Sequence, residues 1–126
     1  MPEAKFDGRS ARLRKHADYQ RVYRESRRYS SASMNYFYRI RGEGEAADAQ
    51  ARVGLTTGRV LGKAVERNRI RRRMREAVRL HVKDLPGCVD VVLHPRRTVL
   101  EMEFGRLAGE VARIFAGVRS GVEAKR

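Results

Sequence analysis

The sequence predicts an α/β sandwich, in which helices pack against one small, mostly antiparallel sheet. Residues 33–41 and 52–57 alternate between apolar and polar side chains with the period of a β-strand. Residues 89–94 form an apolar run that ends at a proline, which is typical of a further strand. Stretches beside these strands repeat apolar residues at helical spacing. Since 126 residues suffice for one core and not for two, we expect a single domain over residues 1–126.

The elements are expected in the order α-β-β-β-α-β-α. The first helix is predicted at about 17–26, where Tyr19, Val22 and Tyr23 share one face. A short strand near 29–31 is the second candidate element. Together these assignments make the first quarter of the chain a short amphipathic helix that leads into the sheet.

Residues 33–41 form the longest predicted strand. The side chains from Met34 to Ile40 at alternate positions are apolar, whereas Arg39 and Arg41 point the other way. This strand should therefore have one face in water, and the sheet face it belongs to should be partly open. Flexible segments are expected at the two ends and in an acidic loop, at about 1–10, 42–50 and 119–126.

A long helix is predicted from about Lys63 to the residue before Pro86, because proline cannot continue a helix. The last helix is predicted to open at Thr98, with Glu101 completing a capping box. The buried face of the long helix should hold Ile70, Met74, Ala77 and Val78. That of the last helix should hold Leu100, Phe104, Leu107, Ala108, Val111 and Phe115.

The charge of the chain indicates a polyanionic partner. Lys and Arg number 29 against 15 Asp and Glu, which gives a formal net charge of +14, and nucleic acid is the leading candidate for such a partner. No apolar run approaches the roughly 20 residues of a membrane span, and the amino terminus lacks the apolar core of a secretory signal. A single cysteine, Cys88, excludes an internal disulfide and a cysteine-rich zinc site. We therefore expect a cytoplasmic protein.

Residues 67–75, RNRIRRRMR, hold six arginines in nine positions. On a helix several of them lie three or four positions apart, where like charges repel. A solvated helix face usually mixes both signs of charge, and only Glu66 and Glu76 dilute this block. The block therefore predicts RNA or DNA binding, with a solvated face as the alternative. Asn68 can order neighbouring arginine side chains or bond to a phosphate or a base edge.

Phe37 lies on the polar side of its strand, between Asn35 and Arg39, where burial does not readily explain an aromatic residue. An exposed aromatic ring among arginines suits stacking on the bases of single-stranded RNA. Packing beneath the first helix explains Phe37 equally well. Tyr19 and Tyr23 are likewise core residues, stacking platforms or both.

The sequence shows no constellation of residues for catalysis. The three histidines, His16, His81 and His94, are scattered along the chain. The carboxylates form no paired pattern of the kind that a two-metal nuclease requires. We therefore expect the chain to hold no catalytic residue and no metal site of its own.

The stretch 58–79, GRVLGKAVERNRIRRRMREAVR, resembles the signature of the bacterial ribonuclease P protein component. In that family a glycine, an Ala-Val pair and an Arg-Asn-Arg triplet open the long helix. The chain departs from the family pattern at Arg59 and Val60, where lysines are common, and at Arg73, where an apolar residue is frequent. The resemblance covers most of the chain and includes residues 12–26, the aromatic strand around Phe37, residues 52–57 and residues 89–93.

The resemblance implies both a fold and a function. The family fold contains an uncommon left-handed βαβ crossover, against the usual hand of such connections. The family protein binds a large catalytic RNA, and the two together remove the 5′ leader of precursor tRNA by metal-dependent hydrolysis of a phosphodiester. The RNA performs the chemistry and binds most of the Mg²⁺, without an organic cofactor. The chain would thus be the protein subunit of an endoribonuclease, with no membrane or DNA partner.

Two groups of site residues follow from the resemblance, position by position. The first lies on the long helix and would contact the catalytic RNA through phosphates; the second would line a cleft between the first helix and the open sheet face, through which the single-stranded leader passes. The first group is Lys63, Arg67, Asn68, Arg69, Arg71, Arg72 and Arg75. The second group is Tyr19, Tyr23, Phe37 and Arg39.

A non-enzymatic RNA-binding module, such as a ribosomal or RNA-assembly protein, is the competing interpretation. A basic helix and an aromatic strand would serve such a protein equally well, and the Arg-Asn-Arg context argues against it. A basic leucine zipper is excluded because no leucine heptad follows the arginine-rich segment.

Overall fold

The computed structural model describes residues 12–42 and 50–125. Three helices and four strands follow one another in the order that the sequence predicts. They are α1 (His16–Glu25), β1 (Tyr29–Ser30), β2 (Met34–Ile40), β3 (Arg52–Leu55), α2 (Ala64–His81), β4 (Val89–Pro95) and α3 (Phe104–Ala124). Three single turns of 3₁₀-helix connect them: η1 (Arg59–Leu61), η2 (Val82–Asp84) and η3 (Arg97–Leu100).

The four strands form one mixed sheet with the spatial order β1-β2-β4-β3. β2 pairs antiparallel with β1 and with β4, whereas β3 joins β4 in parallel. Because β3 and β4 are parallel, the chain must cross over between them, and α2 forms this connection. The mostly antiparallel sheet is confirmed, and the left hand of the crossover stays a prediction.

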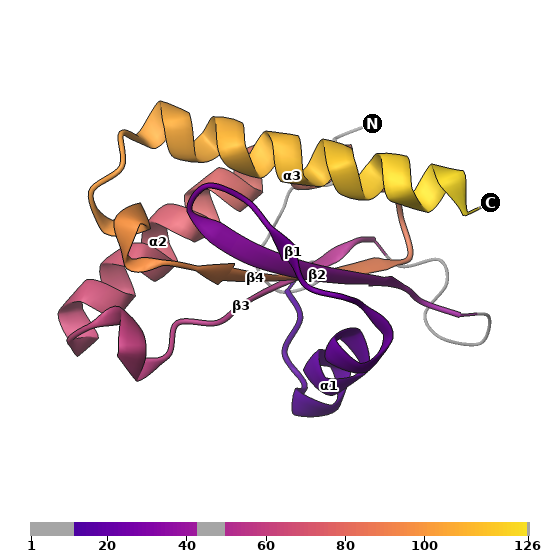
Figure 1. Ribbon diagram of the computed structural model, residues 1–126, viewed down its shortest axis with the longest axis horizontal. Helices are drawn as coiled ribbons and strands as arrows, with labels where there is room; N and C mark the ends of the chain where they lie inside the picture. The colour runs from indigo at the N-terminus through magenta and orange to yellow at the C-terminus, as the bar shows by residue number, and fades with distance from the viewer. Residues whose placement is uncertain (1–11, 43–49, 126) are drawn as a thin grey trace, which may run out of the picture.

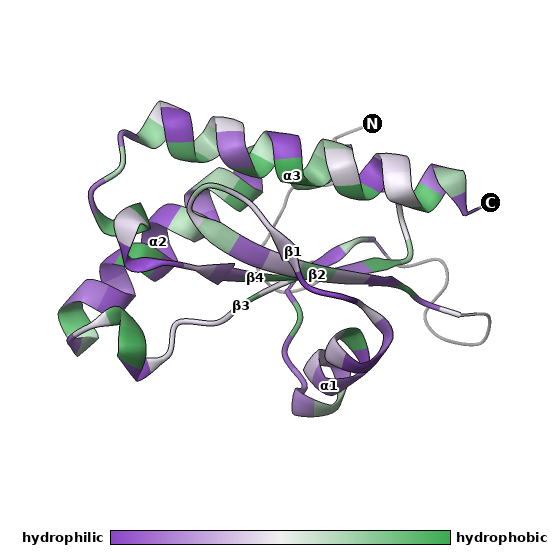
Figure 2. Cartoon of the chain, viewed as in Figure 1, coloured by the Kyte–Doolittle hydropathy of each residue, from purple (hydrophilic) through white to green (hydrophobic). Residues whose placement is uncertain are grey.

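The helices cover the two faces of the sheet unequally (Figure 1). α2 and α3 lie on one face, and the short α1 lies alone on the other. Hydrophilic and apolar residues alternate along α2 and α3 (Figure 2), as expected for helices with one buried side. The face that carries α1 is therefore the less completely covered one.

Each face of the sheet has its own hydrophobic cluster. The main core lies between the sheet and the pair α2 and α3, and it includes Ile70, Met74 and Phe115, none of which is exposed to solvent. A smaller cluster beneath α1 joins Val22 to Val92 of β4. The apolar face predicted for the long helix is confirmed, since all four of its members are buried.

The prediction that the second face of β2 lies in water is wrong. The side chains of Arg39 and Arg41 are only 7% and 1% exposed. Both contact Asp90 of the neighbouring strand β4. The alternation along β2 was interpreted correctly, but α1 and a buried carboxylate cover the polar side.

The predicted start of the last helix is also wrong, since α3 begins at Phe104 and not near Thr98. The carboxylate of Glu103 caps this helix by accepting bonds from the backbone N–H groups of Gly105 and Arg106 in its first turn, at 2.8 and 3.2 Å. Residues 119–124 are helical and Val122 is buried, and the flexibility expected of residues 119–126 stays a prediction. The expected flexible segment 1–10, and residues 43–49 of the expected acidic loop 42–50, lie outside the described residues.

Candidate nucleic-acid interface

The start of α2 is held by hydrogen bonds that involve Glu66. Its Oε1 accepts a bond from the backbone N–H of Lys63 at 3.0 Å, and its Oε2 accepts one from Arg97 Nη2 at 2.5 Å. These bonds, first that of Arg97, lower the pKa of Glu66 to about 2. Gly62 precedes the helix with a φ of 125°, and a Cβ there would meet the side chains of Arg97 and Glu66. The first turn of α2 is thereby fastened to η3.

The first predicted site group forms a positively charged surface along α2. Arg67 and Arg71 are partly buried, and the other members of the group are exposed. Over residues 12–42 and 50–125, no carboxylate lies within 4.0 Å of the guanidinium groups of this surface. Its positive charge is therefore not neutralised by the part of the chain that the structure describes. The arginines concerned are Arg67, Arg69, Arg71, Arg72 and Arg75.

Neutral side chains orient one of these arginines. Arg71 Nη1 donates to Asn68 Oδ1 at 2.6 Å, and Arg71 Nη2 donates to Thr57 Oγ1 at 2.7 Å. The expectation that Asn68 orders a neighbouring arginine is confirmed. Because both partners are uncharged, they fix the guanidinium group without cancelling its attraction for a phosphate.

Arg73, one of the departures from the family pattern, faces away from this surface. Its Nε donates to the carbonyl oxygen of Val99 at 3.0 Å, and its Nη2 donates to that of Met102. Arg73 thus joins α2 to the segment before α3. The arginine block combines exposed cations with one structural arginine.

The aromatic group lies on the opposite side of the sheet, where α1 packs on β2 and β4. The Tyr23 ring meets the Phe37 ring edge-on, with 5.1 Å between their centroids. Tyr23 Oη and His94 Nε2 share a hydrogen bond of 2.9 Å, and the ring of His94 also contacts that of Phe37. Burial lowers the pKa of His94 and raises that of Tyr23. These rings pack together, and each of the three residues is partly exposed.

Tyr19 extends the aromatic group toward the edge of the sheet. Its hydroxyl donates to the carbonyl oxygen of Leu13 at 3.2 Å. A Cβ at Gly54 of β3 would lie 2.5 Å from the Tyr19 hydroxyl, so this close approach requires glycine. Tyr19 and Tyr23 therefore belong both to the small cluster and to its accessible rim.

A charged network anchors α1 beside the aromatic rings. Asp90 is fully buried on β4 and accepts bonds from Arg52 Nε at 2.9 Å and Arg52 Nη2 at 2.8 Å, besides one from Arg41. The bonds with Asp90 raise the pKa of Arg52. Arg52 also pairs with Asp18 of α1 at 3.4 Å.

Arg39 completes this network from β2. Its Nη1 lies 4.0 Å from Asp90 Oδ2, and its Nε lies 3.3 Å from Glu25 Oε1 at the end of α1. The structure thus brings Tyr19, Tyr23 and Phe37 together at the surface but places Arg39 below it. The exposure expected of a leader-contacting arginine is absent in this conformation.

Sequence reasoning missed His94 and Asp90 as partners of this face. The alternation along β4 places both on the same side as Val92, and this pattern could have been read from the sequence. Their neighbours could not, because β4 lies between β2 and β3, which precede it in the chain.

Within the described part of the chain, no three His, Cys, Asp or Glu side chains gather in a way that could hold a metal ion. None of its helices is long and apolar enough to span a membrane.

The sequence of this chain is similar to those of proteins from one family. A family model described as Ribonuclease P matches residues 8–119. The ribonuclease P protein component of Chloroflexus aggregans is 40% identical over 109 residues, covering 85% of this chain and 76% of that protein. The one from Oleidesulfovibrio alaskensis is 40% identical over 89 residues, covering 71% of this chain and 69% of that protein.

Solved structures share the fold. The RNase P protein of Staphylococcus aureus superimposes with a TM-score of 0.69 at 23% identity, covering 86% of this chain and 97% of that one. The RNase P protein of Thermotoga maritima also gives a TM-score of 0.69 at 23% identity, covering 82% and 94%. The fold of this chain is thus shared with these proteins.

Proposed function

The chain belongs to the family of bacterial ribonuclease P protein components, the protein subunits of the enzyme that processes tRNA 5′ ends, and we propose from this that α2 binds the catalytic RNA while the cleft beside α1 holds the leader of precursor tRNA. The observation that carries the proposal is the row of arginines along α2 without carboxylate partners among the described residues. Phosphates that bind along such a row reduce the repulsion between its arginines. Each neutralised phosphate also releases counterions, which favours binding.

The aromatic group supports the second half of the proposal. Single-stranded RNA presents base faces, and Tyr19, Tyr23 and Phe37 offer partly exposed rings on the less covered face of the sheet. In this proposal Arg39 acts from below, by holding Glu25 and Asp90, and does not touch the leader. His94 joins the cleft through its bond with Tyr23.

Mg²⁺ is assigned to the RNA partner in this proposal. Asp90 is surrounded by arginines, and Glu110 accepts hydrogen bonds from Ser31 and Ser33. These buried carboxylates are therefore engaged with donors from the chain, and neither offers free oxygens to a cation. The protein's own contribution is to bind and orient two RNAs, and hydrolysis of the phosphodiester takes place on the catalytic RNA.

Reconstitution tests the proposal directly. RNA-free protein, a bacterial ribonuclease P RNA and labelled precursor tRNA are combined at low Mg²⁺, where the RNA alone is slow. We expect the protein to restore release of the intact leader and to leave a 5′-phosphate on the mature tRNA. Leader release by the protein without the RNA, or no stimulation of the RNA by the protein, would contradict it. A non-enzymatic RNA-binding module would bind RNA but give no such stimulation.

A further inference from the structure

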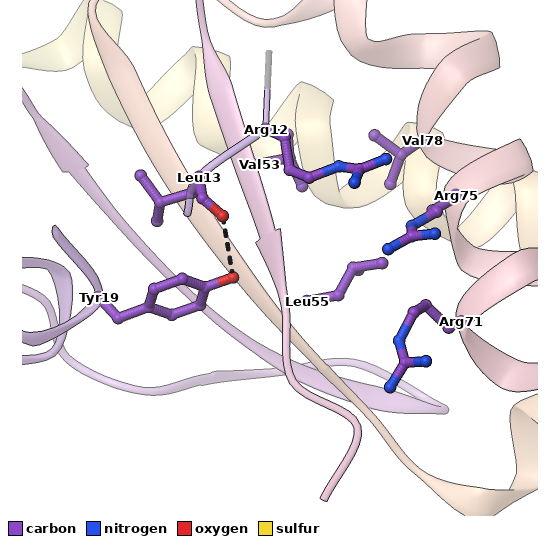
Figure 3. A pocket seen from close by; sticks show the side chains of 8 residues that line it. All are labelled: Arg12, Leu13, Tyr19, Val53, Leu55, Arg71, Arg75 and Val78. Atoms are coloured by element: carbon purple, nitrogen blue, oxygen red, sulfur yellow. Dashed lines mark hydrogen bonds between the residues drawn. The ribbon is translucent and has the colours of Figure 1, made fainter. Parts of the chain in front are cut away.

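A small hollow lies between the segment that precedes α1, the outer strand β3 and α2 (Figure 3). It is separate from the aromatic cleft, although Tyr19 borders both. Arg71 and Arg75 extend from α2 toward Leu55 of β3, and Arg12 reaches across from the opposite side. We call this the arginine-rimmed hollow.

The floor of the hollow is apolar, mostly buried and hydrogen-bonded to the preceding segment of the chain. Val53 and Val78 are 4% and 2% exposed, and Leu55 is partly exposed above them. Leu13 N donates to the carbonyl oxygen of Val53 at 3.1 Å, so the incoming chain closes the outer edge of β3 at this point. The floor therefore does not need a further strand to satisfy its backbone here.

The rim concentrates positive charge beside that floor. No carboxylate within the described ranges lies in ion-pair distance of Arg12, Arg71 or Arg75. Partial burial, followed by the neighbouring Arg12 and Arg71, lowers the pKa of Arg75. An anion that bound among the three guanidinium groups would relieve their mutual repulsion, and a phosphate matches their donors.

The size of the hollow limits the group beside the phosphate. Its volume is about 80 Å³, whereas a cavity of about 150 Å³ holds one benzene molecule. The hollow therefore has room for the edge of one base and not for a whole base.

We propose that the arginine-rimmed hollow binds one unpaired nucleotide of an RNA, with its phosphate on the three arginines and the edge of its base on the apolar floor. The inference rests on the proposed RNA-binding role of α2 and extends it from phosphate attraction to recognition of one nucleotide. An apolar floor with a few convergent polar groups is the usual composition of a small-ligand site. Phosphate contacts alone would need the rim and not the floor.

Mononucleotide binding tests the proposal on the free protein. Uridine 5′-monophosphate and ribose 5-phosphate carry the same phosphate, and only the first has a base. In NMR titrations at constant ionic strength, we expect the amides of 53–55 and 71–78 to shift. We expect uridine 5′-monophosphate to bind about tenfold more tightly than ribose 5-phosphate. Equal affinities would overturn the proposal, because they would show an adventitious anion on the rim.

A matched pair of variants separates the hollow from general charge. Arg75→Gln and Arg79→Gln each remove one charge from α2, but Arg79 is paired with Glu76 away from the hollow. We expect the first to weaken uridine 5′-monophosphate binding at least about fivefold and the second to change it by less than about twofold. Similar losses in both variants would refute the assignment. Leu55→Ala should weaken uridine 5′-monophosphate while leaving ribose 5-phosphate unchanged.

The source of the nucleotide is identified in the assembled enzyme. The holoenzyme is irradiated with ultraviolet light with and without precursor tRNA, and the crosslinked residues are mapped, so that the hollow keeps its native lining. A crosslink from residues 53–55 or 71–78 to an unpaired nucleotide of either RNA supports the proposal and names the source. Crosslinks to neither RNA, or only to paired segments, overturn it. Since the titrations need no catalytic RNA, their failure would leave the reconstitution assay unaffected.

Discussion

Replacement of Asp90 by Asn should strongly destabilise the fold, although it leaves the packing of the side chains unchanged. The side chain is 0% exposed and receives both Nε and Nη2 of Arg52, together with Nη1 of Arg41. Asn has the same size, so the substitution creates no cavity. It removes the charge around which three guanidinium groups, including that of Arg39, are gathered.

The magnitude follows from what the substitution leaves behind. Arg39 and Arg41 are 7% and 1% exposed, so neither cation can regain its hydration without opening the sheet. Breaking a buried ion pair by removing one partner typically costs about 3 to 5 kcal/mol. A domain of this size is stable by about 5 to 15 kcal/mol, so Asp90→Asn should lower the melting temperature by about 10 to 20 °C.

Urea and thermal unfolding measure this effect, with Glu76→Gln as the control. Glu76 also pairs with an arginine, at 2.6 Å, but both partners are about half exposed, and this variant should unfold almost like the parent chain. The double variant Asp90→Asn with Arg52→Gln should lose less stability than the sum of the two single losses. The reason is that Arg52→Gln removes one of the three cations that Asp90→Asn leaves without a carboxylate. The reasoning fails if Asp90→Asn costs less than about 1 kcal/mol or if the two losses simply add.

Arg67→Gln combined with Arg69→Gln should lower the slope of log affinity for the catalytic RNA against log salt by up to about 2, with thermal unfolding unchanged. An unchanged slope with reduced stability would make both arginines structural. Phe37→Ala should weaken binding of precursor tRNA by about 1 to 3 kcal/mol and hardly affect mature tRNA. Equal losses for both tRNAs with a large fall in melting temperature would show a core role instead. The folded state lowers the pKa of Glu66 from 4.5 to about 2, so its stabilisation is complete above pH 4.5 and is lost as the pH falls toward 2. Glu66→Gln should therefore flatten the pH dependence of the free energy of unfolding, measured with urea, over that range. An unaltered pH dependence would contradict this.

The elements with a local signal were predictable from the sequence. The apolar positions of α2 repeat at helical spacing, and all four predicted members are buried. The short distance from Asn68 to Arg71, three positions along a helix, also allowed their contact to be foreseen. In both cases the interacting residues belong to one element, so spacing alone determines which side chains meet.

The start of α3 depended on a contact between distant segments. Thr98 and Glu101 have the spacing of a capping box, but a helix beginning there would need the carbonyl groups of Val99 and Met102 for its own ladder. Arg73 takes both of these carbonyl groups. The helix begins after them, at Phe104 with Glu103 as its cap, and nothing in residues 98–104 reveals the presence of that arginine.

The predicted site residues also divide into those with a local signal in the sequence and those whose environment depends on a distant strand. Phe37 on β2 was recognisable because it departs from its local pattern, whereas Tyr19 and Tyr23 follow the apolar face of α1. The burial of Arg39 was not recognisable, because its partner Asp90 comes from a strand that is 51 positions later and lies beside β2 only through the non-sequential strand order. An arginine on a predicted open face thus became a structural residue once the central strand placed a carboxylate opposite it.

The ion pairs at the two ends of α1 explain how one sheet face can serve both folding and binding. Asp18 in the first turn pairs with Arg52 at 3.4 Å, and Glu25 at the last residue pairs with Arg39 at 3.3 Å. Both arginines also contact the same buried carboxylate, so the helix is held to the sheet at each end through one centre. The tyrosines lie between these attachments. In the proposed complex with the leader, Tyr23 can therefore exchange its ring contacts with Phe37 and His94 for contacts with RNA bases without releasing the helix from the sheet.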